Sequence, residues 1–287
     1  MHPRRIQFLF RFGYDGSRFH GLQPQPALPT AGGALRERIR EAAEQSPRAL
    51  AFSARTDAGV HAQLNLSTCW LVGPLDADEF CERVARPRND GLFFVQAEMV
   101  PVHVHARGIA RGKRYRYIIE DGCDATRIES RYAWQIVPEL DLPRMREGAR
   151  LLEGTFDFSS FRAARCNMKS AEKTLTRVRI YGPLPLPEKR RRIFIELCGN
   201  AFLRKMVRII VGTLAEVGAH LRTPDEVARI RDAKSRAAAG ITAPARGLVL
   251  MRVGCAWPED GSGRLPQLAG LEDERDPAPK ANPNGKP

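Results

Sequence analysis

Short segments with strand-like patterns recur along the whole chain, and they constrain its fold more than any other feature of the sequence. The clearest alternation of apolar and polar residues lies at residues 4–13, 64–72 and 113–120. Other extended segments are expected at residues 92–100, 174–182, 191–198 and 247–254. Alternation of this kind is typical of strands with one buried face.

Helical segments separate these strands in no regular order. They are expected at residues 31–45, 76–86, 141–152, 201–218 and 224–236. The first carries Leu35, Ile39 and Ala42 at helical spacing and has Thr30 as a candidate N-cap. This irregular order favours an α+β fold with an antiparallel mixed sheet flanked by helices over a doubly wound parallel sheet.

The charge of the chain points to an acidic partner. Its 287 residues are 43% hydrophobic, enough for a substantial core, and the formal net charge is +13 with a pI near 10.0. A globular body this basic favours binding to a polyanion, most often nucleic acid. A generically basic proteome would give the same charge, so the charge alone does not decide.

Several classes of protein lose support from what the sequence lacks. No run of 18 apolar residues occurs, and the N-terminus is expected to form a strand rather than a signal peptide. The six cysteines form no C-x-x-C pair, which indicates reduced thiols and a cytoplasmic protein. There is no P-loop, G-x-G-x-x-G, G-x-S-x-G or metal-ligand motif. Chemistry on RNA by side chains alone, without cofactor or metal, is the class that remains, and a single carboxylate is then the natural nucleophile or electrostatic stabiliser.

Residues 53–62 read SARTDAGVHA and place Asp57 among small residues. An Asp before Ala-Gly is usually a turn residue that hydrogen-bonds its own backbone. Ala54, Ala58 and Gly59 would instead let a flat ligand approach closely, and Arg55 could anchor a phosphate. A lone histidine is more often structural, so His61 is not expected to take part in the chemistry.

The predicted strand KRYRYIIE, at 113–120, alternates bases with aromatic residues. Lys113, Arg114 and Arg116 could contact RNA phosphates, and Tyr115 could stack on a base. Tyr115 and Tyr117 would share one face, with the two arginines on the other. A sheet with tyrosines in its core and arginines in solvent fits the pattern equally well.

The predicted helix at 201–218 carries an arginine opposite its apolar face. Arg208 lies on a side lined by small residues, where another surface could pack closely. A desolvated arginine needs an anionic partner, and Asp57 would fit, although spacing does not establish the pair. Farther along, Leu248 and Leu250 share a face of a short strand, for which core packing is the default interpretation.

Together the motifs SARTDAGVHA, KRYRYII, GTFDFSSFRA, NAFLRKMVRIIVGTL and GLVL resemble the TruA-type tRNA pseudouridine synthases over residues 5–257. YDGSRFHGLQPQ is similar to that family's opening loop. The resemblance implies a pseudouridine synthase fold with two α+β lobes, here residues 1–105 and 106–257, around a central basic cleft. Residues 258–287 are expected to be a disordered tail.

The same resemblance assigns roles to individual residues. Asp57 matches the essential aspartate, and Arg208 matches the arginine that pairs with it. Arg55 matches the arginine associated with opening the RNA. Tyr115 matches the tyrosine that stacks on the uracil and can remove the C5 proton, and Leu248 matches an apolar residue beside the base. The family also implies a homodimer that needs no cofactor or metal and acts on uridines at tRNA positions 38–40.

Departures from the family pattern leave the target open. They lie near Leu22, near Ala31 and within residues 86–100. Alternatives are a divergent paralogue acting on another RNA uridine, or a non-catalytic RNA-binding protein of the same fold. A metal-dependent nuclease is disfavoured because the sequence has no carboxylate or histidine cluster.

Overall fold

The computed structural model describes residues 5–123, 130–166 and 168–255. Its strands are β1 (Arg5–Tyr14), β2 (Arg48–Phe52), β3 (His61–Val72), β4 (Leu92–Val100), β5 (Ala110–Asp121), β6 (Trp134–Gln135), β7 (Gly154–Asp157), β8 (Glu172–Pro185), β9 (Arg191–Gly199) and β10 (Leu248–Cys255). No helix in these ranges is long and apolar enough to cross a membrane. The tail expected at residues 258–287 lies outside the described residues.

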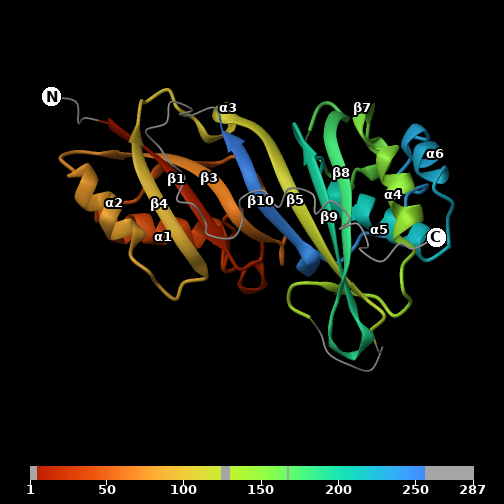
Figure 1. Ribbon diagram of the computed structural model, residues 1–287. Coiled ribbons are helices and arrows are strands. Elements are labelled where there is room, and N and C mark those ends of the chain that lie inside the picture. The colour runs from red at the N-terminus through yellow and green to blue at the C-terminus, as the bar shows by residue number, and fades with distance from the viewer. Residues whose placement is uncertain (1–4, 124–129, 167, 256–287) are drawn as a thin grey trace, which may run out of the picture. The chain divides into compact units, whose positions relative to one another are not determined.

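All ten strands join one sheet, in the order β4-β1-β3-β10-β5-β9-β8-β7, with β2 added to β3 and β6 to β5. Every pairing is antiparallel except β10 with β3 and β6 with β5. The last strand, β10, therefore runs between β3 from the first third of the chain and β5 from the middle, as Figure 1 shows. The predicted α+β fold with a mainly antiparallel sheet is confirmed.

Helices lie against both halves of the sheet (Figure 1). They are α1 (Ala31–Ala43), α2 (Ala77–Ala85), α3 (Ala106–Ile109), α4 (Leu142–Arg150), α5 (Met206–Gly218) and α6 (Glu226–Asp232), with short 3-10 turns η1 (Gly16–Arg18), η2 (Ser159–Phe161), η3 (Pro187–Lys189) and η4 (Ala245–Gly247). The predicted face of α1 is buried, and Thr30 caps the helix by accepting a hydrogen bond from Gly33 N at 3.1 Å.

Helix α5 begins later than its sequence pattern predicts. Residues 201–205 are not helical, because the backbone of Lys205 adopts a left-handed conformation with φ of 59° and interrupts the turn. As a result, Arg208 lies in the first turn of α5. The positive end of the helix dipole makes this an unfavourable place for a cation that has no anionic partner.

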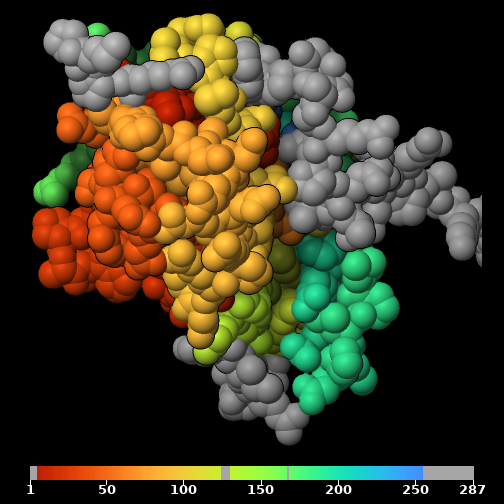
Figure 2. Space-filling model, turned by 90° about the vertical axis from the view of Figure 1, so that its left-hand side faces the viewer, coloured from red at the N-terminus to blue at the C-terminus, as the bar shows by residue number. Residues whose placement is uncertain are grey.

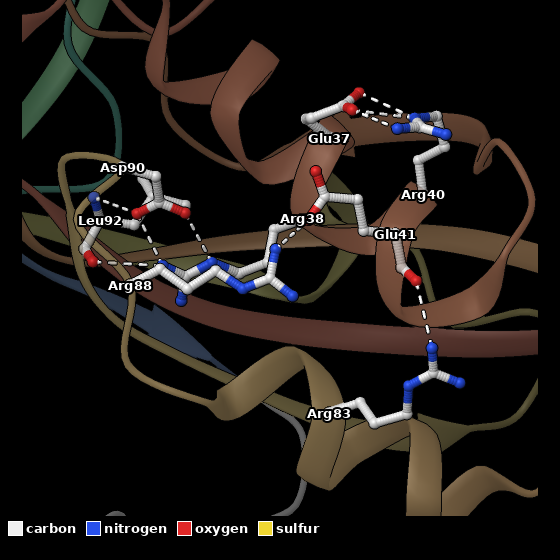
Figure 3. A network of polar contacts seen from close by, with 8 residues as sticks. All are labelled: Glu37, Arg38, Arg40, Glu41, Arg83, Arg88, Asp90 and Leu92. Carbon is white, nitrogen blue, oxygen red and sulfur yellow. Dashed lines mark hydrogen bonds and ion pairs between the residues drawn. The ribbon is translucent and has the colours of Figure 1, made fainter.

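A buried arginine fixes the segment between α2 and β4, where the sequence departs from the family pattern. Arg38 of α1 donates to both carboxylate oxygens of Asp90, at 2.8 and 2.6 Å (Figure 3). The same segment holds the loop after β1, because Arg18 donates to Asn89 Oδ1 at 2.9 Å. Figure 2 views the molecule from this end, where α2 and the edge strand β4 (orange) form the front surface.

Candidate active site

Asp57 and Arg208 form an ion pair across the fold. Arg208 Nη1 lies 2.9 Å from Asp57 Oδ2, although 151 residues separate them in the sequence. The arginine side chain is 13% exposed and the aspartate side chain 31% exposed. The pair therefore lies at the protein surface with its arginine largely withdrawn from water, and one carboxylate edge stays accessible to a ligand.

The position of Arg208 is set by the segment that follows α6. Arg208 Nε donates to the carbonyl oxygen of Ala243 at 2.7 Å, and Ala243 N donates back to the Arg208 carbonyl at 3.1 Å. A Cβ on Gly212, one turn further along α5, would come within 1.9 Å of the Ile241 carbonyl oxygen. The close packing predicted on the small-residue side of this helix is therefore present.

The turn that carries Asp57 rests on the loop after β1. Leu22 N donates to the Thr56 carbonyl at 3.2 Å, and the hydroxyl groups of Tyr14 and Thr56 lie 2.7 Å apart. Gly59 has φ of 79°, a left-handed conformation that favours glycine, and Val60 N closes the turn on the Asp57 carbonyl at 3.2 Å. The small residues of SARTDAGVHA thus allow a tight turn that packs closely against its neighbours.

Tyr115 of β5 is buried close to Asp57. Its ring packs edge-on against Phe202, with centroids 5.0 Å apart. Burial raises the pKa of the Tyr115 phenol well above its usual range, and the electrostatic effect of the nearby Tyr14 and Asp57 side chains raises it further. The phenol is therefore protonated at neutral pH, and its hydroxyl makes no hydrogen bond to any described residue.

Leu248 is the first residue of β10 and is buried, as expected for a residue that packs. In the sheet it pairs with Tyr117, and its neighbour Val249 pairs with His61. Tyr117 in turn donates from its hydroxyl to the Pro244 carbonyl at 2.7 Å. The start of β10 is therefore fixed between the strand that bears Tyr115 and the strand that follows the Asp57 turn.

The predicted RNA-binding residues separate into two groups. Arg55 is exposed and has no partner among the described residues, and Lys113 lies on the Tyr115 face of β5, where burial lowers the pKa of its ammonium group. Arg114 and Arg116 lie on the opposite face and bind the fully buried Glu196, with shortest distances of 2.7 and 2.6 Å. The predicted division of β5 into a tyrosine face and an arginine face is confirmed.

The sequence did not single out three residues that shape the site, namely Tyr14, Phe202 and Ala243. Tyr14 is buried, with a pKa raised by burial to about 12, and it supports the Asp57 turn through Thr56. Tyr14 and Phe202 both lie within motifs that carry the family resemblance, and membership of these motifs is the signal that could have identified them. Within the described ranges, no group of three or more His, Cys, Asp or Glu side chains could hold a metal ion.

Comparison with known proteins identifies relatives over most of the chain. A family model described as tRNA pseudouridine synthase matches residues 149–254. The tRNA pseudouridine synthase A of Syntrophotalea carbinolica is 37% identical over 86% of this chain and 95% of its own length. The protein of that name from Pseudomonas aeruginosa is 37% identical over 91% and 90%, and that from Shouchella clausii is 36% identical over 86% and 93%.

Proposed function

The chain belongs to the tRNA pseudouridine synthase family, and on that basis we propose that it converts uridine to pseudouridine in tRNA with Asp57 as its nucleophile. It is an isomerase that acts on tRNA. We further propose that its targets are uridines at positions 38–40 of the anticodon stem-loop. The observation that carries the catalytic assignment is the Asp57–Arg208 ion pair beside the buried Tyr115.

The reaction requires only groups that the site contains. The glycosidic bond from C1′ to N1 breaks, a bond from C1′ to C5 forms, C5 loses a proton and N1 gains one. Nothing is oxidised or hydrolysed, so the balance needs no co-reactant. Asp57 presents a carboxylate that can attack the nucleoside or stabilise positive charge on the sugar. The guanidinium of Arg208 holds that carboxylate in place from a rigid helix end.

Tyr115 is placed to act on the base. A uridine must leave its stack to reach Asp57, at a cost of a few kcal/mol. The ring of Tyr115 and the side chain of Leu248 would provide replacement contacts. The Tyr115 hydroxyl has no hydrogen-bond partner in the described part of the chain. A neutral phenol can donate one hydrogen bond while its oxygen accepts another, so it can give its own proton to N1 as its oxygen receives the proton from C5. We assign it to the proton movement between C5 and N1.

Unpaired cations near the site would contact the RNA backbone. Arg55 is exposed two residues before Asp57, and the half-buried Lys113 has no described anionic partner. Phosphate groups would supply that partner. RNA binding by Arg114 and Arg116, on the other face of the sheet, stays a prediction, as does the homodimer. The five cysteines whose side chains are described are free, which supports a cytoplasmic protein.

Replacing Asp57 tests this assignment. We expect Asp57→Asn to abolish pseudouridine formation in tRNA and to leave tRNA affinity close to that of the unmodified protein. Glu82→Gln is a matched control, because Glu82 is an exposed carboxylate on α2, away from the site. Undiminished product with Asp57→Asn would contradict the nucleophile assignment. Pseudouridine mapped only at other positions, or only in other RNAs, would contradict the proposed target.

A further inference from the structure

His61 is buried at the start of β3, four residues after Asp57, and the proposed chemistry does not use it. Its Nδ1 atom accepts a hydrogen bond from Gly16 N at 3.0 Å. The same Nδ1 atom lies 3.1 Å from Oδ1 of Asp15. One nitrogen atom is thus within hydrogen-bond distance of a donor and of an acceptor that follow one another in the chain.

These two contacts exclude one another. Without a proton, Nδ1 has a lone pair that accepts from Gly16 N. With a proton, Nδ1 donates to Asp15, and the N–H of Gly16 then faces another N–H and loses its partner. An unpaired buried N–H is energetically costly, so protonation of His61 favours a shift of the Gly16 backbone.

The surroundings of the ring favour the neutral form. Burial lowers the pKa of the His61 imidazole, and this outweighs the opposite effect of Asp15 and of the Arg246 and Arg131 backbone carbonyls. The ring of Tyr132 lies 5.0 Å from that of His61, and its hydroxyl donates to Asp15 Oδ2 at 3.1 Å. The other ring nitrogen, Nε2, is buried and makes no hydrogen bond of normal geometry within the described ranges.

Gly16 transmits the state of His61 to the turn that carries Asp57. A Cβ on Gly16 would come within 2.2 Å of the Val60 carbonyl oxygen, so the two backbones are in direct contact. Val60 N closes the turn on the Asp57 carbonyl at 3.2 Å. On the other side, a Cβ on Gly59 would meet the Cβ of Ala245 at 3.3 Å. A movement of Gly16 therefore displaces a turn that is packed on both sides.

We propose that His61, neutral and accepting from Gly16 at Nδ1, is a positioning residue that holds the Asp57 turn in its reactive geometry. Protonation at Nδ1 transfers the contact to Asp15, releases Gly16 and lowers the turnover rate. The active form is present above the pKa of His61 in the folded protein and is lost as the pH falls through it. Because burial lowers that pKa, the loss occurs below the ordinary imidazole value of about 6.5.

Two substitutions with amide side chains separate the hydrogen bond to Gly16 from the space that the His61 side chain fills. The side-chain oxygen of Asn can occupy the place of Nδ1 and accept from Gly16 without titrating, whereas Gln places its amide near Nε2. Because this role rests on the proposed function, activity is measured as pseudouridine formation in tRNA. We expect His61→Asn to retain most of kcat and to lose the acid decline. His61→Gln should lower kcat on the order of tenfold with little change in KM. Equal kcat values for the two variants, or an unchanged acid decline in His61→Asn, would overturn the proposal.

Nuclear magnetic resonance of the free protein gives a readout that does not depend on the reaction. With ¹⁵N-labelled histidine and glycine, we expect the Nε2-protonated neutral tautomer of His61 and a Gly16 amide shift that titrates with it. Asp15→Asn removes a charge that raises the pKa of His61, so both titrations should move to lower pH. If the Gly16 amide shift does not change as His61 titrates, the proposal is overturned, whether or not the protein forms pseudouridine in tRNA. If His61 and the Gly16 amide titrate together but the unmodified protein forms no pseudouridine in tRNA, the result would count against the proposed function instead.

Discussion

Arg208 makes two contacts through different nitrogen atoms, and a lysine can reproduce only one of them. Nη1 binds Asp57 and Nε binds the carbonyl oxygen of the buried Ala243. We expect Arg208→Lys to lower kcat by at least tenfold, because the carboxylate is no longer held in one orientation. The free energy of unfolding should fall by about 1–3 kcal/mol if the Ala243 carbonyl is left unpaired.

Steady-state kinetics and urea unfolding of the same variant measure the two effects separately. Arg229→Lys is the matched control, because Arg229 is exposed on α6. An Arg208→Lys enzyme with the kcat of the unmodified protein would show that the guanidinium geometry does not matter to Asp57.

The Tyr115 hydroxyl can be removed without changing the packing of the ring. We expect Tyr115→Phe to lower kcat by roughly 10²–10⁴-fold, the usual range for losing a group that moves a proton, with KM nearly unchanged. Tyr115→Leu removes the ring as well and should also raise KM. Single-turnover assays on tRNA distinguish these effects. Phe and Leu variants that behave alike would show that Tyr115 acts through its ring alone.

The individual site residues were easier to predict from the sequence than their contacts. Asp57 stands out because its neighbours are small, and Arg208 because small residues surround it on its helix. Their pairing joins positions 151 residues apart, so it followed from the family resemblance and not from spacing. The contact of His61 with Gly16 could not be predicted either, because a hydrogen bond between segments far apart in the sequence leaves no periodic signal.

At the scale of elements, the strand pair β5–β9 contains one buried carboxylate shared by two arginines. Glu196 is fully buried, while the side chains of Arg114 and Arg116 are 43% and 24% exposed. We expect Arg114→Met alone to cost about 1 kcal/mol or less, because solvent screens its charge and Arg116 still pairs with the glutamate. Replacing both arginines leaves a buried charge unpaired and should cost about 3–5 kcal/mol.

A double-mutant cycle measured by urea unfolding checks this coupling. If the losses in unfolding free energy of the two single variants add up to the loss in the double variant, the buried Glu196 does not need one of the two arginines as a partner. The tRNA affinity of the same variants tests the separate prediction that these arginines bind RNA. A loss of stability without a loss of affinity would assign them to the sheet alone.

The types of the elements were predictable, and their ends and neighbours were less so. The strand and helix patterns predicted β1, β3, β4, β5, β8, β9 and β10, and the helices α1, α2, α4, α5 and α6. They did not predict β6, β7 and α3, because elements of two to four residues are too short to show a period. The predicted start of α5 lies five residues before the observed one, because the spacing of apolar residues does not encode the conformation of Lys205. The place of β10 between β3 and β5 depends on long-range pairing, which a single sequence does not reveal.

At the scale of the whole molecule, the sheet is continuous across the two predicted lobes. Strand β10, from the end of the second predicted lobe, pairs with β3 of the first and with β5 of its own. The proposed catalytic groups come from both predicted lobes. Asp57 belongs to the first, and Tyr115 and Arg208 belong to the second. The lobe boundary at residue 105 and the central basic cleft stay predictions.

The net charge of +13 predicts that tRNA affinity falls steeply with salt, because each neutralised phosphate releases counterions. A plot of log affinity against log salt should therefore slope downward, and Arg55→Gln should make the slope shallower by roughly one if Arg55 contacts one phosphate. Arg229→Gln, which removes an equal charge from the exposed surface of α6, should leave the slope unchanged. Filter-binding or fluorescence titrations over a range of salt concentrations measure both slopes. Equal slopes for the two variants would mean that the overall charge attracts the RNA without a contact at Arg55, and a flat response would contradict the electrostatic argument itself.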